Sequence, residues 1–338
     1  MVTTKDIAEK SGVSRGTVSR VLNNSPNVNK ETRRKVQKVI DELNYIPNEA
    51  ARSLVMRKSL KIALVTFSKP YDFWGEIKKG FELARRDLSY SGVEIDYIET
   101  NIEEPYEQVE VIDKIILENY DGVALCPNNP MIMTLSLKKL EENNIPVVLY
   151  NVDMPKSNSI AFVGCNHYQS GVLAGELFKK LYTLRNGKIS IFTLQDFIQP
   201  IDDRVQGFLS VVKNCENINI VDIKKFDREG TNLSNRFKDA VKIDNVDGLF
   251  LTIDGLGVLG NEIEEMGLKD KFILVGYDFN ENVKKYLKNG CITSTITHEP
   301  VRQSYEAIHI LFDYLTLKRL PAIEKNYTKL ELIMDSNS

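Results

Sequence analysis

Residues 2–54 read VTTKDIAEKSGVSRGTVSRVLNNSPNVNKETRRKVQKVIDELNYIPNEAARSL, and this stretch decides the fold of the N-terminal part of the chain. Its apolar residues recur at helical spacing in three short segments, as in amphipathic helices that each bury one face. Gly12 lies between the first two segments, where a helix stop needs a positive φ, and Ser14 and Asn29 can cap the second and third helices. The pattern predicts a helix, a tight turn and two further helices, although a generic three-helix bundle has the same periodicity.

The second of these helices leaves basic and hydroxyl-bearing residues outside the core. Because its valines and leucine face the core, the residues at its start and on its open face remain outside. These outward residues are Arg15, Gly16, Thr17, Ser19 and Arg20. The start of such a helix can enter the major groove, where arginine makes a bidentate contact with guanine and hydroxyl groups reach phosphates or base edges. The alternative is that exposed arginines on a helix form an ordinary solvated face.

The charge of the chain is unevenly distributed. Residues 1–58 hold 12 Lys and Arg against 6 Asp and Glu, a balance of about +6, whereas the rest of the chain carries about −9. A basic first segment on an acidic body suits a unit that binds phosphates, because Lys and Arg displace the counterions condensed on nucleic acid. A locally basic surface can also be merely solvated, so charge alone does not decide.

The same stretch closely resembles the headpiece of the lactose/galactose repressor family over about fifty consecutive positions. The resemblance implies that Arg15, Gly16 and Arg20 read bases. It also implies that contacts with the DNA backbone fix the register. These contacts are made by Thr3, Ser14, Thr17 and Ser19, with Asn23 and Tyr45 in support. DNA binding with sequence specificity is therefore the expected function of this part.

Residues 48–56 match the hinge helix of that family, which folds in the minor groove and inserts an apolar wedge at the centre of the operator. By position Leu54 is the wedge, and Ala51 is expected to contact DNA beside it. Pro47 fixes the chain ahead of a helix that is too short to be stable alone. We therefore expect the helix to form only with DNA and with the hinge of a second subunit. Alternatively, Leu54 caps the core of the following domain.

From residue 61 onward, short β-branched runs alternate with helix-length segments, which is typical of a doubly wound α/β fold. The expected strands are residues 62–67, 93–97, 123–126, 147–150, 160–163, 189–193, 218–223, 249–253, 272–276 and 292–296. So many strands predict two lobes rather than one sheet. The family resemblance extends over this whole remainder and implies the type I periplasmic sugar-binding fold, with a ligand in the cleft between the lobes.

The expected fold class is thus an all-α helix-turn-helix headpiece plus an α/β two-lobed, periplasmic-binding-protein-like domain with two doubly wound parallel sheets. We expect the helix-turn-helix domain at residues 1–46, the hinge helix and linker at 47–58, and the effector-binding and dimerisation domain at 59–338. By resemblance the chain crosses between the lobes three times, near residues 157, 290 and 320.

The candidate effector site follows from where an open α/β sheet binds ligands, which is beyond the carboxyl ends of its strands. Phe73 or Trp74 can cover the apolar face of a sugar ring, although a lone tryptophan is as readily a core residue. Asn, Asp and Arg side chains offer the donors and acceptors that ring hydroxyls require. The candidate residues are Asp72, Phe73, Trp74, Asn151, Arg204, Asp254, Asp278 and His298.

Of the three histidines, only His298 is a candidate site residue. His298 stands where the family often has glutamine, so it could recognise a different substituent, titrate near neutral pH, or be a satisfied histidine at the edge of the cleft. His167 and His309 lie within expected helices and are assigned no function, as surface or packing residues.

Three classes of function compete. A plain solute-binding protein is disfavoured for two reasons. Such a protein has no use for a headpiece, and the charged first ten residues contain no apolar core of a signal peptide for export. An enzyme is disfavoured because there is no phosphate loop, nucleophile elbow or metal-ligand cluster. The four cysteines lie far apart, as reduced buried thiols do, so we expect no metal and no cofactor.

We therefore expect a cytoplasmic regulator, in particular a repressor of carbohydrate uptake or catabolism genes, that binds pseudo-palindromic operator DNA and a small sugar-like effector and has no membrane partner. A homodimer is favoured over a tetramer, because the chain ends without apolar heptads. The identity of the effector stays open, and release of DNA by an inducer is favoured over a corepressor.

Overall fold

The computed structural model describes residues 4–22, 28–43, 60–69, 71–196, 198–227 and 232–338. The N-terminal unit consists of α1 (Thr4–Ser11), α2 (Arg15–Leu22) and α3 (Lys30–Glu42). Gly12 ends α1 with a φ of +64°, which glycine adopts without strain. The predicted caps are present, because Ser14 Oγ accepts from the Thr17 amide at 3.1 Å and Asn29 Oδ1 accepts from the Thr32 amide at 2.7 Å.

The three helices enclose a small core of their own. Its fully or almost fully buried members are Ile7, Ala8, Val18, Val21, Val36, Val39 and Ile40. These are the apolar positions that the helical spacing selects, so the helix-turn-helix arrangement follows from the sequence.

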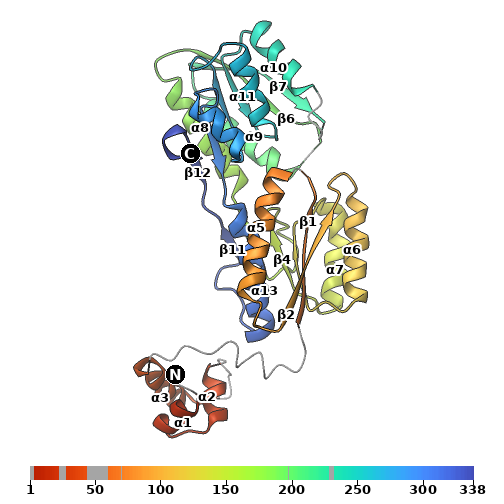
Figure 1. The fold of residues 1–338 in the computed structure, drawn as a ribbon, viewed down its shortest axis with the longest axis vertical. Helices are drawn as coiled ribbons and strands as arrows, with labels where there is room; N and C mark the ends of the chain where they lie inside the picture. Colours follow the sequence, from red (N-terminus) through yellow and green to blue (C-terminus); the bar gives the residue numbers. More distant parts are fainter. Residues whose placement is uncertain (1–3, 23–27, 44–59, 70, 197, 228–231) are drawn as a thin grey trace.

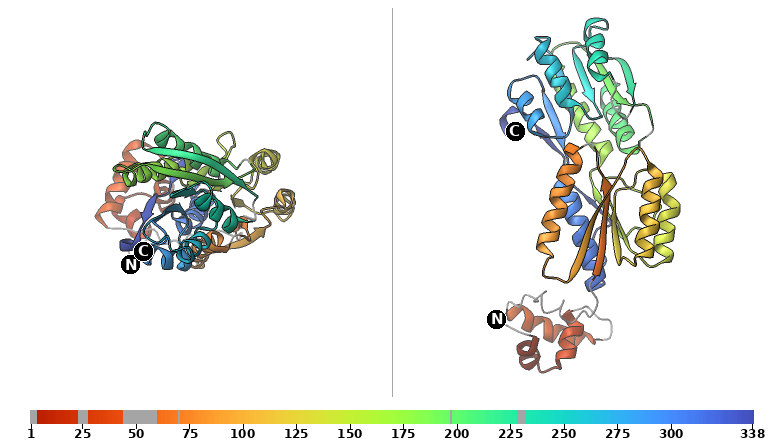
Figure 2. Two further views of the ribbon diagram at one scale, coloured as in Figure 1. Left: turned by 90° about the horizontal axis from the view of Figure 1, so that it is seen from above. Right: turned by 45° about the vertical axis from the view of Figure 1, so that its right-hand side comes forward.

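The rest of the described chain forms two lobes, each built on a six-stranded sheet. The sheet of lobe 1 has the order β11-β5-β4-β3-β1-β2, and every pair in it is parallel. Its strands are β1 (Leu60–Phe67), β2 (Val93–Thr100), β3 (Gly122–Leu125), β4 (Val147–Tyr150), β5 (Ala161–Gly164) and β11 (Lys325–Tyr327). Helices α5 (Tyr71–Asp87) and α13 (Pro300–Leu317) cover one face, and α6 (Pro105–Leu117) and α7 (Pro130–Glu142) cover the other (Figure 2).

Lobe 2 repeats this architecture with the order β12-β10-β9-β8-β6-β7. Its strands are β6 (Gly187–Leu194), β7 (Ile218–Phe226), β8 (Gly248–Leu251), β9 (Ile273–Tyr277), β10 (Ser294–Thr297) and β12 (Glu331–Ile333). One face is covered by α8 (His167–Leu181) and α9 (Gln199–Val212), the other by α10 (Leu233–Lys242), α11 (Leu256–Glu265) and α12 (Glu281–Lys288). The expected two-lobed fold class is confirmed, and each of the expected strands has a counterpart.

The two short strands near the C-terminus were not expected. Strand β11 extends the parallel sheet of lobe 1 at its edge, whereas β12 runs antiparallel to β10 at the edge of lobe 2. The last strands of the chain therefore divide between the lobes.

The chain passes between the lobes at three places (Figure 1). The passages lie between β5 and α8, between β10 and α13, and between β11 and β12. Each begins about eight residues later than the expected positions near 157, 290 and 320, because the chain leaves a lobe directly at the end of a strand. Among the described residues, no helix is long and apolar enough to cross a membrane.

Candidate functional site

A cavity of about 850 Å³ lies between the lobes and is lined by residues of both. The carboxyl ends of β1, β3 and β4 face it from lobe 1, and those of β6, β8 and β9 face it from lobe 2. This is where open parallel sheets bind ligands, and the volume suits a small molecule. Seven of the eight residues predicted for the effector site line this cavity, namely Phe73, Trp74, Asn151, Arg204, Asp254, Asp278 and His298.

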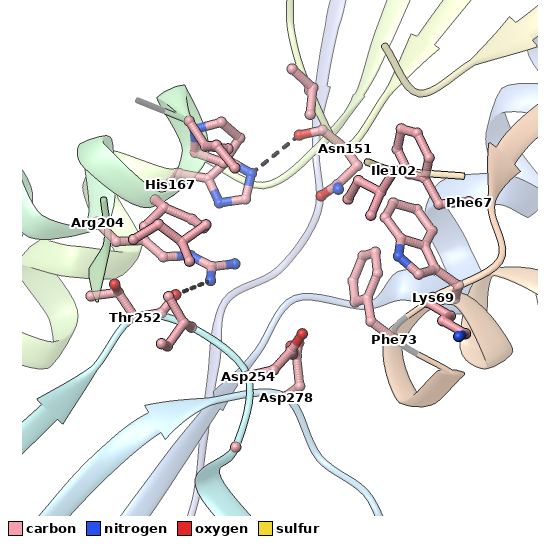
Figure 3. Close-up of a pocket in the computed structure, with 18 of the residues that line it drawn as sticks. Phe67, Lys69, Phe73, Ile102, Asn151, His167, Arg204, Thr252, Asp254 and Asp278 are labelled. Carbon is pink, nitrogen blue, oxygen red and sulfur yellow. Dashed lines mark hydrogen bonds between the residues drawn. The ribbon is translucent and has the colours of Figure 1, made fainter. Parts of the chain in front are cut away.

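Aromatic side chains form the lobe 1 wall of the cavity (Figure 3). Trp74 packs edge-to-face against Phe67 and Phe73, with ring centroids 4.9 and 4.7 Å apart. Phe73 and Trp74 are both buried, so the tryptophan is a core residue as well as part of the wall. Phe67, which ends β1, was not among the predicted site residues. Together these rings offer an apolar surface that a sugar ring can cover.

Arg204 points into the cavity from α9 (Figure 3). Its Nη1 donates to the Thr252 carbonyl at 3.0 Å, and its guanidinium lies 3.7 Å from the centre of the Tyr277 ring. The side chain is buried, and its Nε has no hydrogen-bond partner among the described residues. A buried, fixed guanidinium with donors still unused is suited to bind oxygen atoms of a ligand.

Two residues at strand ends hold their side chains at the cavity through left-handed backbone geometry. Asn151, after β4, has a φ of +60°, and Asp278, after β9, has a φ of +66°. Asn and Asp adopt this region more readily than most residues. The backbone of Asp278 is held on both sides, because its amide donates to the Ile296 carbonyl at 3.1 Å and its carbonyl accepts from Thr295 Oγ1 at 2.6 Å.

His298 lies at the passage from β10 to α13 and is almost fully buried. Its ring centroid is 5.3 Å from that of Phe73. Burial, and then the positive charge of Arg204, lowers the pKa of His298 to about 3. The imidazole is therefore neutral at physiological pH, and the expectation that it could titrate near neutral pH is wrong.

His167, which we assigned no function, also lines the cavity. Its Nε2 lies 3.1 Å from the Asn151 carbonyl, so this nitrogen donates, and its Nδ1 lies 3.2 Å from Cys165 Sγ. Burial, and then the charges of Arg204 and His298, lowers the pKa of His167 well below its usual value. This residue follows β5 almost directly, so the rule that selects residues after strands would have found it.

Further lining residues were also missed by the sequence analysis. They follow the ends of strands in the same way, and among them are Lys69, Glu103, Asn128 and Thr252. The signal that could have found them is again the position after a strand. The side chain of Asp72, the eighth predicted residue, lies outside what the structure describes.

The N-terminal unit presents a second candidate site at the start of α2. Ser14, Arg15 and Gly16 are exposed there and Thr17 is half-buried, while the Ser14 and Thr17 hydroxyls lie 2.9 Å apart. The side chains of Ser19 and Arg20, and all of Thr3, Asn23, Ala51 and Leu54, fall outside the described part. The described residues thus leave the open end of α2 accessible to a partner.

The fold and the cleft together define a two-lobed binding protein that carries a helix-turn-helix unit at its N-terminus. Residues 62–319 match the periplasmic binding protein domain, and residues 3–48 match the bacterial regulatory proteins of the lacI family. The chain belongs to the lacI family of bacterial regulatory proteins and has a periplasmic binding protein domain as its larger part. The resemblance stated from the sequence is thereby confirmed.

Individual relatives agree with this assignment. The chain is 33% identical over 221 residues to the "Probable HTH-type transcriptional repressor ExuR" of Bacillus subtilis (strain 168), which covers 63% of this chain and 60% of that protein. It is 28% identical over 294 residues to the sucrose operon repressor of Lactococcus lactis subsp. lactis, with 86% of both chains covered. The chain thus spans about three fifths of the first of these relatives. Both are named as repressors and neither as an enzyme.

A solved structure supports the fold of the larger part. The solute binding protein of an ABC transporter from Burkholderia graminis, in complex with D-arabinose, matches with a TM-score of 0.76 at 21% identity. The match covers 83% of this chain and 98% of that chain. At this identity the likeness concerns the fold alone.

Proposed function

We propose that the protein is a cytoplasmic, sequence-specific DNA-binding repressor of carbohydrate uptake or catabolism genes, controlled by a small sugar-like effector in the cleft. The observation that carries the proposal is the union, in one chain, of an exposed helix start with Arg15 and a cavity lined by aromatic rings, Arg204 and Asp278. The relatives add support, since one is named a sucrose operon repressor and another a ribose operon repressor.

On the DNA side, α2 enters the major groove with its N-terminal end. Arg15, Gly16 and Arg20 read base edges, and Thr3, Ser14, Thr17, Ser19 and Asn23 fix the register on phosphates. Residues 48–56 form a hinge helix, in which Ala51 contacts DNA and Leu54 is the minor-groove wedge. One headpiece reads one half-site, so the protein acts as a homodimer on a pseudo-palindromic operator.

On the effector side, the ligand lies between the lobes and contacts both. Phe73 and Trp74 cover its apolar face, and Asn151, Arg204, Asp254 and Asp278 bind its hydroxyl groups, with Asp72 and His298 at the same site. Lobe closure changes the spacing of the two hinge helices and thereby their mutual packing on the operator. We favour an inducer, which releases DNA. A coupling of about 1–3 kcal/mol changes operator affinity roughly 5- to 150-fold.

Two measurements on the full chain test the proposal. Selection from random duplex DNA followed by anisotropy titration measures operator binding, in which Arg20→Ala is expected to cost about 1–3 kcal/mol and to relax one base position in each half-site. Thermal-shift screening against sugars measures effector binding, since a ligand at 100 times its Kd stabilises the folded state by about 2.7 kcal/mol. Sugar binding without any preferred DNA sequence would instead indicate a solute-binding protein, and turnover of a sugar would indicate an enzyme.

A further inference from the structure

The buried imidazole of His298 has one nitrogen that is satisfied by the protein and one that is not. His298 Nε2 has no hydrogen-bond partner among the described residues, although the side chain is only 1% exposed. Asp278 Oδ1 lies 3.7 Å away, which is too far for a hydrogen bond. Because a buried polar atom without a partner is costly, this gap at the wall of the cavity points to a group that the ligand supplies.

The other nitrogen reveals which proton His298 carries. Gln303 Nε2 lies 3.0 Å from the His298 carbonyl and 2.8 Å from His298 Nδ1. A carbonyl oxygen only accepts, so the amide must present its NH2 group to this residue rather than its oxygen. Its second hydrogen then points to Nδ1, which has to be the unprotonated nitrogen of a neutral ring. The proton of His298 is consequently on Nε2, the nitrogen that faces Asp278.

Gln303 is well placed to hold this arrangement. It lies on α13, is completely buried, and does not line the cavity. The main chain of Asp278 is held by two hydrogen bonds to β10. His298 Nε2, a donor, and Asp278 Oδ1, an acceptor, lie 3.7 Å apart, so one oxygen atom can lie within hydrogen-bond distance of both.

We propose that Gln303 is a positioning residue that fixes the Nε2–H tautomer of His298, so that His298 and Asp278 together select a hydroxyl group of the ligand. The hydroxyl oxygen accepts from His298 Nε2, and the hydroxyl hydrogen is donated to the Asp278 carboxylate. This inference rests on the proposed function, since it specifies one polar contact of the proposed effector. A carboxylate or phosphate oxygen can accept from His298 but has no hydrogen for Asp278. The pair therefore selects a hydroxyl at this point of the ligand over an anionic group or a missing oxygen.

The tautomer is tested first, on the full-length protein without ligand. Long-range ¹H–¹⁵N spectra of protein labelled with ¹⁵N-histidine distinguish the two neutral tautomers and the imidazolium, and His298→Phe identifies the signal. We expect the Nε2–H form in the wild type at pH 7, and a mixture or the Nδ1–H form in Gln303→Met. Gln108→Met is the matched control, because Gln108 is an equally buried amide that bonds Cys126 and Asn128 instead. An Nδ1–H or doubly protonated His298 in the wild type overturns the proposal.

The hydroxyl is tested with defined probes, namely D-arabinose, D-ribose, D-galactose, D-glucose and sucrose, and then the monodeoxy analogues of the tightest binder. We expect one position at which loss of the hydroxyl weakens binding roughly ten- to hundredfold, as for a hydrogen bond to a charged group. In His298→Phe and in Gln303→Met, that penalty should shrink at this position alone. Equal penalties in wild type and both variants overturn the proposal. If none of the five sugars binds, the sugar assignment of the proposed function fails, while the spectra still decide the part played by Gln303.

Discussion

Arg204 is a cation in a buried position, and its charge acts on several groups around the cleft. Together with the larger effect of burial, it lowers the pKa of both His167 and His298. Burial raises the pKa of the Cys165 thiol to about 12, and the charge of Arg204 opposes that shift. Both imidazoles are thus neutral and the thiol is protonated near pH 7. The pattern of donors and acceptors at this part of the cleft is therefore independent of physiological changes in pH.

The first prediction concerns ligand binding. Arg204→Ala and Asp278→Asn are each expected to abolish the response to effector while operator binding without ligand stays near that of the wild type. Asn is preferred to Ala at position 278 because it tolerates the φ of +66° and removes only the charge. Isothermal titration with a sugar found by thermal shift, followed by operator titration with and without it, provides the measurement. Unchanged sugar affinity in both variants would contradict the site.

The second prediction concerns acid stability. The unfolded chain binds a proton on His298 below about pH 6.5, whereas the folded protein does so only near pH 3. The free energy of unfolding must then fall as the pH is lowered between these values, by up to about 1.4 kcal/mol per pH unit for this residue. His298→Gln should reduce the slope of the free energy of unfolding against pH by that amount between about pH 6.5 and pH 3. Above pH 7 the substitution should not change how this free energy depends on pH. Urea unfolding at pH 7, 6, 5 and 4 tests this, and parallel slopes for both proteins would refute it.

At the scale of elements, the close packing of α8 and α9 holds Arg204 in place. A Cβ atom added at Gly171 would lie 2.0 Å from the Arg204 carbonyl oxygen, and one at Gly207 would lie 2.0 Å from the Tyr168 carbonyl oxygen. Glycine at both positions allows the two backbones to approach this closely. The position of the guanidinium in the cleft thus depends on residues that never touch the cavity.

The third prediction follows from this contact. Gly171→Ala is expected to destabilise the fold by about 1–3 kcal/mol, because the two helices must separate, and to weaken effector binding by displacing Arg204. Gly75→Ala, in the interior of α5, is the matched control, since nothing lies within 4 Å of its added Cβ and alanine favours the helix by about 0.5–1 kcal/mol. Thermal unfolding and sugar titration distinguish the two. Equal stability of both variants would mean that the helices do not depend on the contact.

The sequence predicted the long elements well and the short or positional features less well. Strands with several β-branched residues, such as β1 and β6, follow from local composition. Strands β11 and β12 lie at sheet edges and have three residues each. Such a segment is too short to show an alternation of apolar and polar residues. The passages between lobes have no local signature either: Gly290, with a φ of +78°, turns the chain within lobe 2 and not between lobes.

The candidate site was predicted in the same uneven way. Asn151 and Asp278 follow strands and were found because the end of a parallel strand defines the binding edge. His167 was missed because a helical histidine is ordinarily a surface or packing residue, and its position just after β5 was not weighed against that rule. Gln303, by contrast, follows His298 by only five residues, near the start of α13, so this contact is local in the sequence and was simply not considered.

At the scale of the whole molecule, the proposed function requires two copies of the chain. The fourth prediction is that light scattering finds a dimer and that footprinting on the selected operator finds two protected half-sites about one helical turn apart. Leu54→Ala should reduce DNA bending in a circular-permutation assay, because the wedge is lost. A single protected half-site, or bending unaffected by the substitution, would rule out the paired-hinge arrangement.

The division of the last strands between the lobes also governs the order in which the protein can fold during synthesis. The core of lobe 1 includes Ala307, Ile308 and Leu311 of α13, and its edge strand β11 comes later still. All the other strands of lobe 1 are translated before lobe 2, so the sheet face that α13 shares with α5 stays partly uncovered while about two fifths of the chain is translated. Exposed apolar sheet of this kind favours aggregation. Chains of this protein should therefore depend on chaperones until α13 has left the ribosome, and released chains that end at residue 290 should be more sensitive to protease in lobe 1 than released chains that end at residue 338.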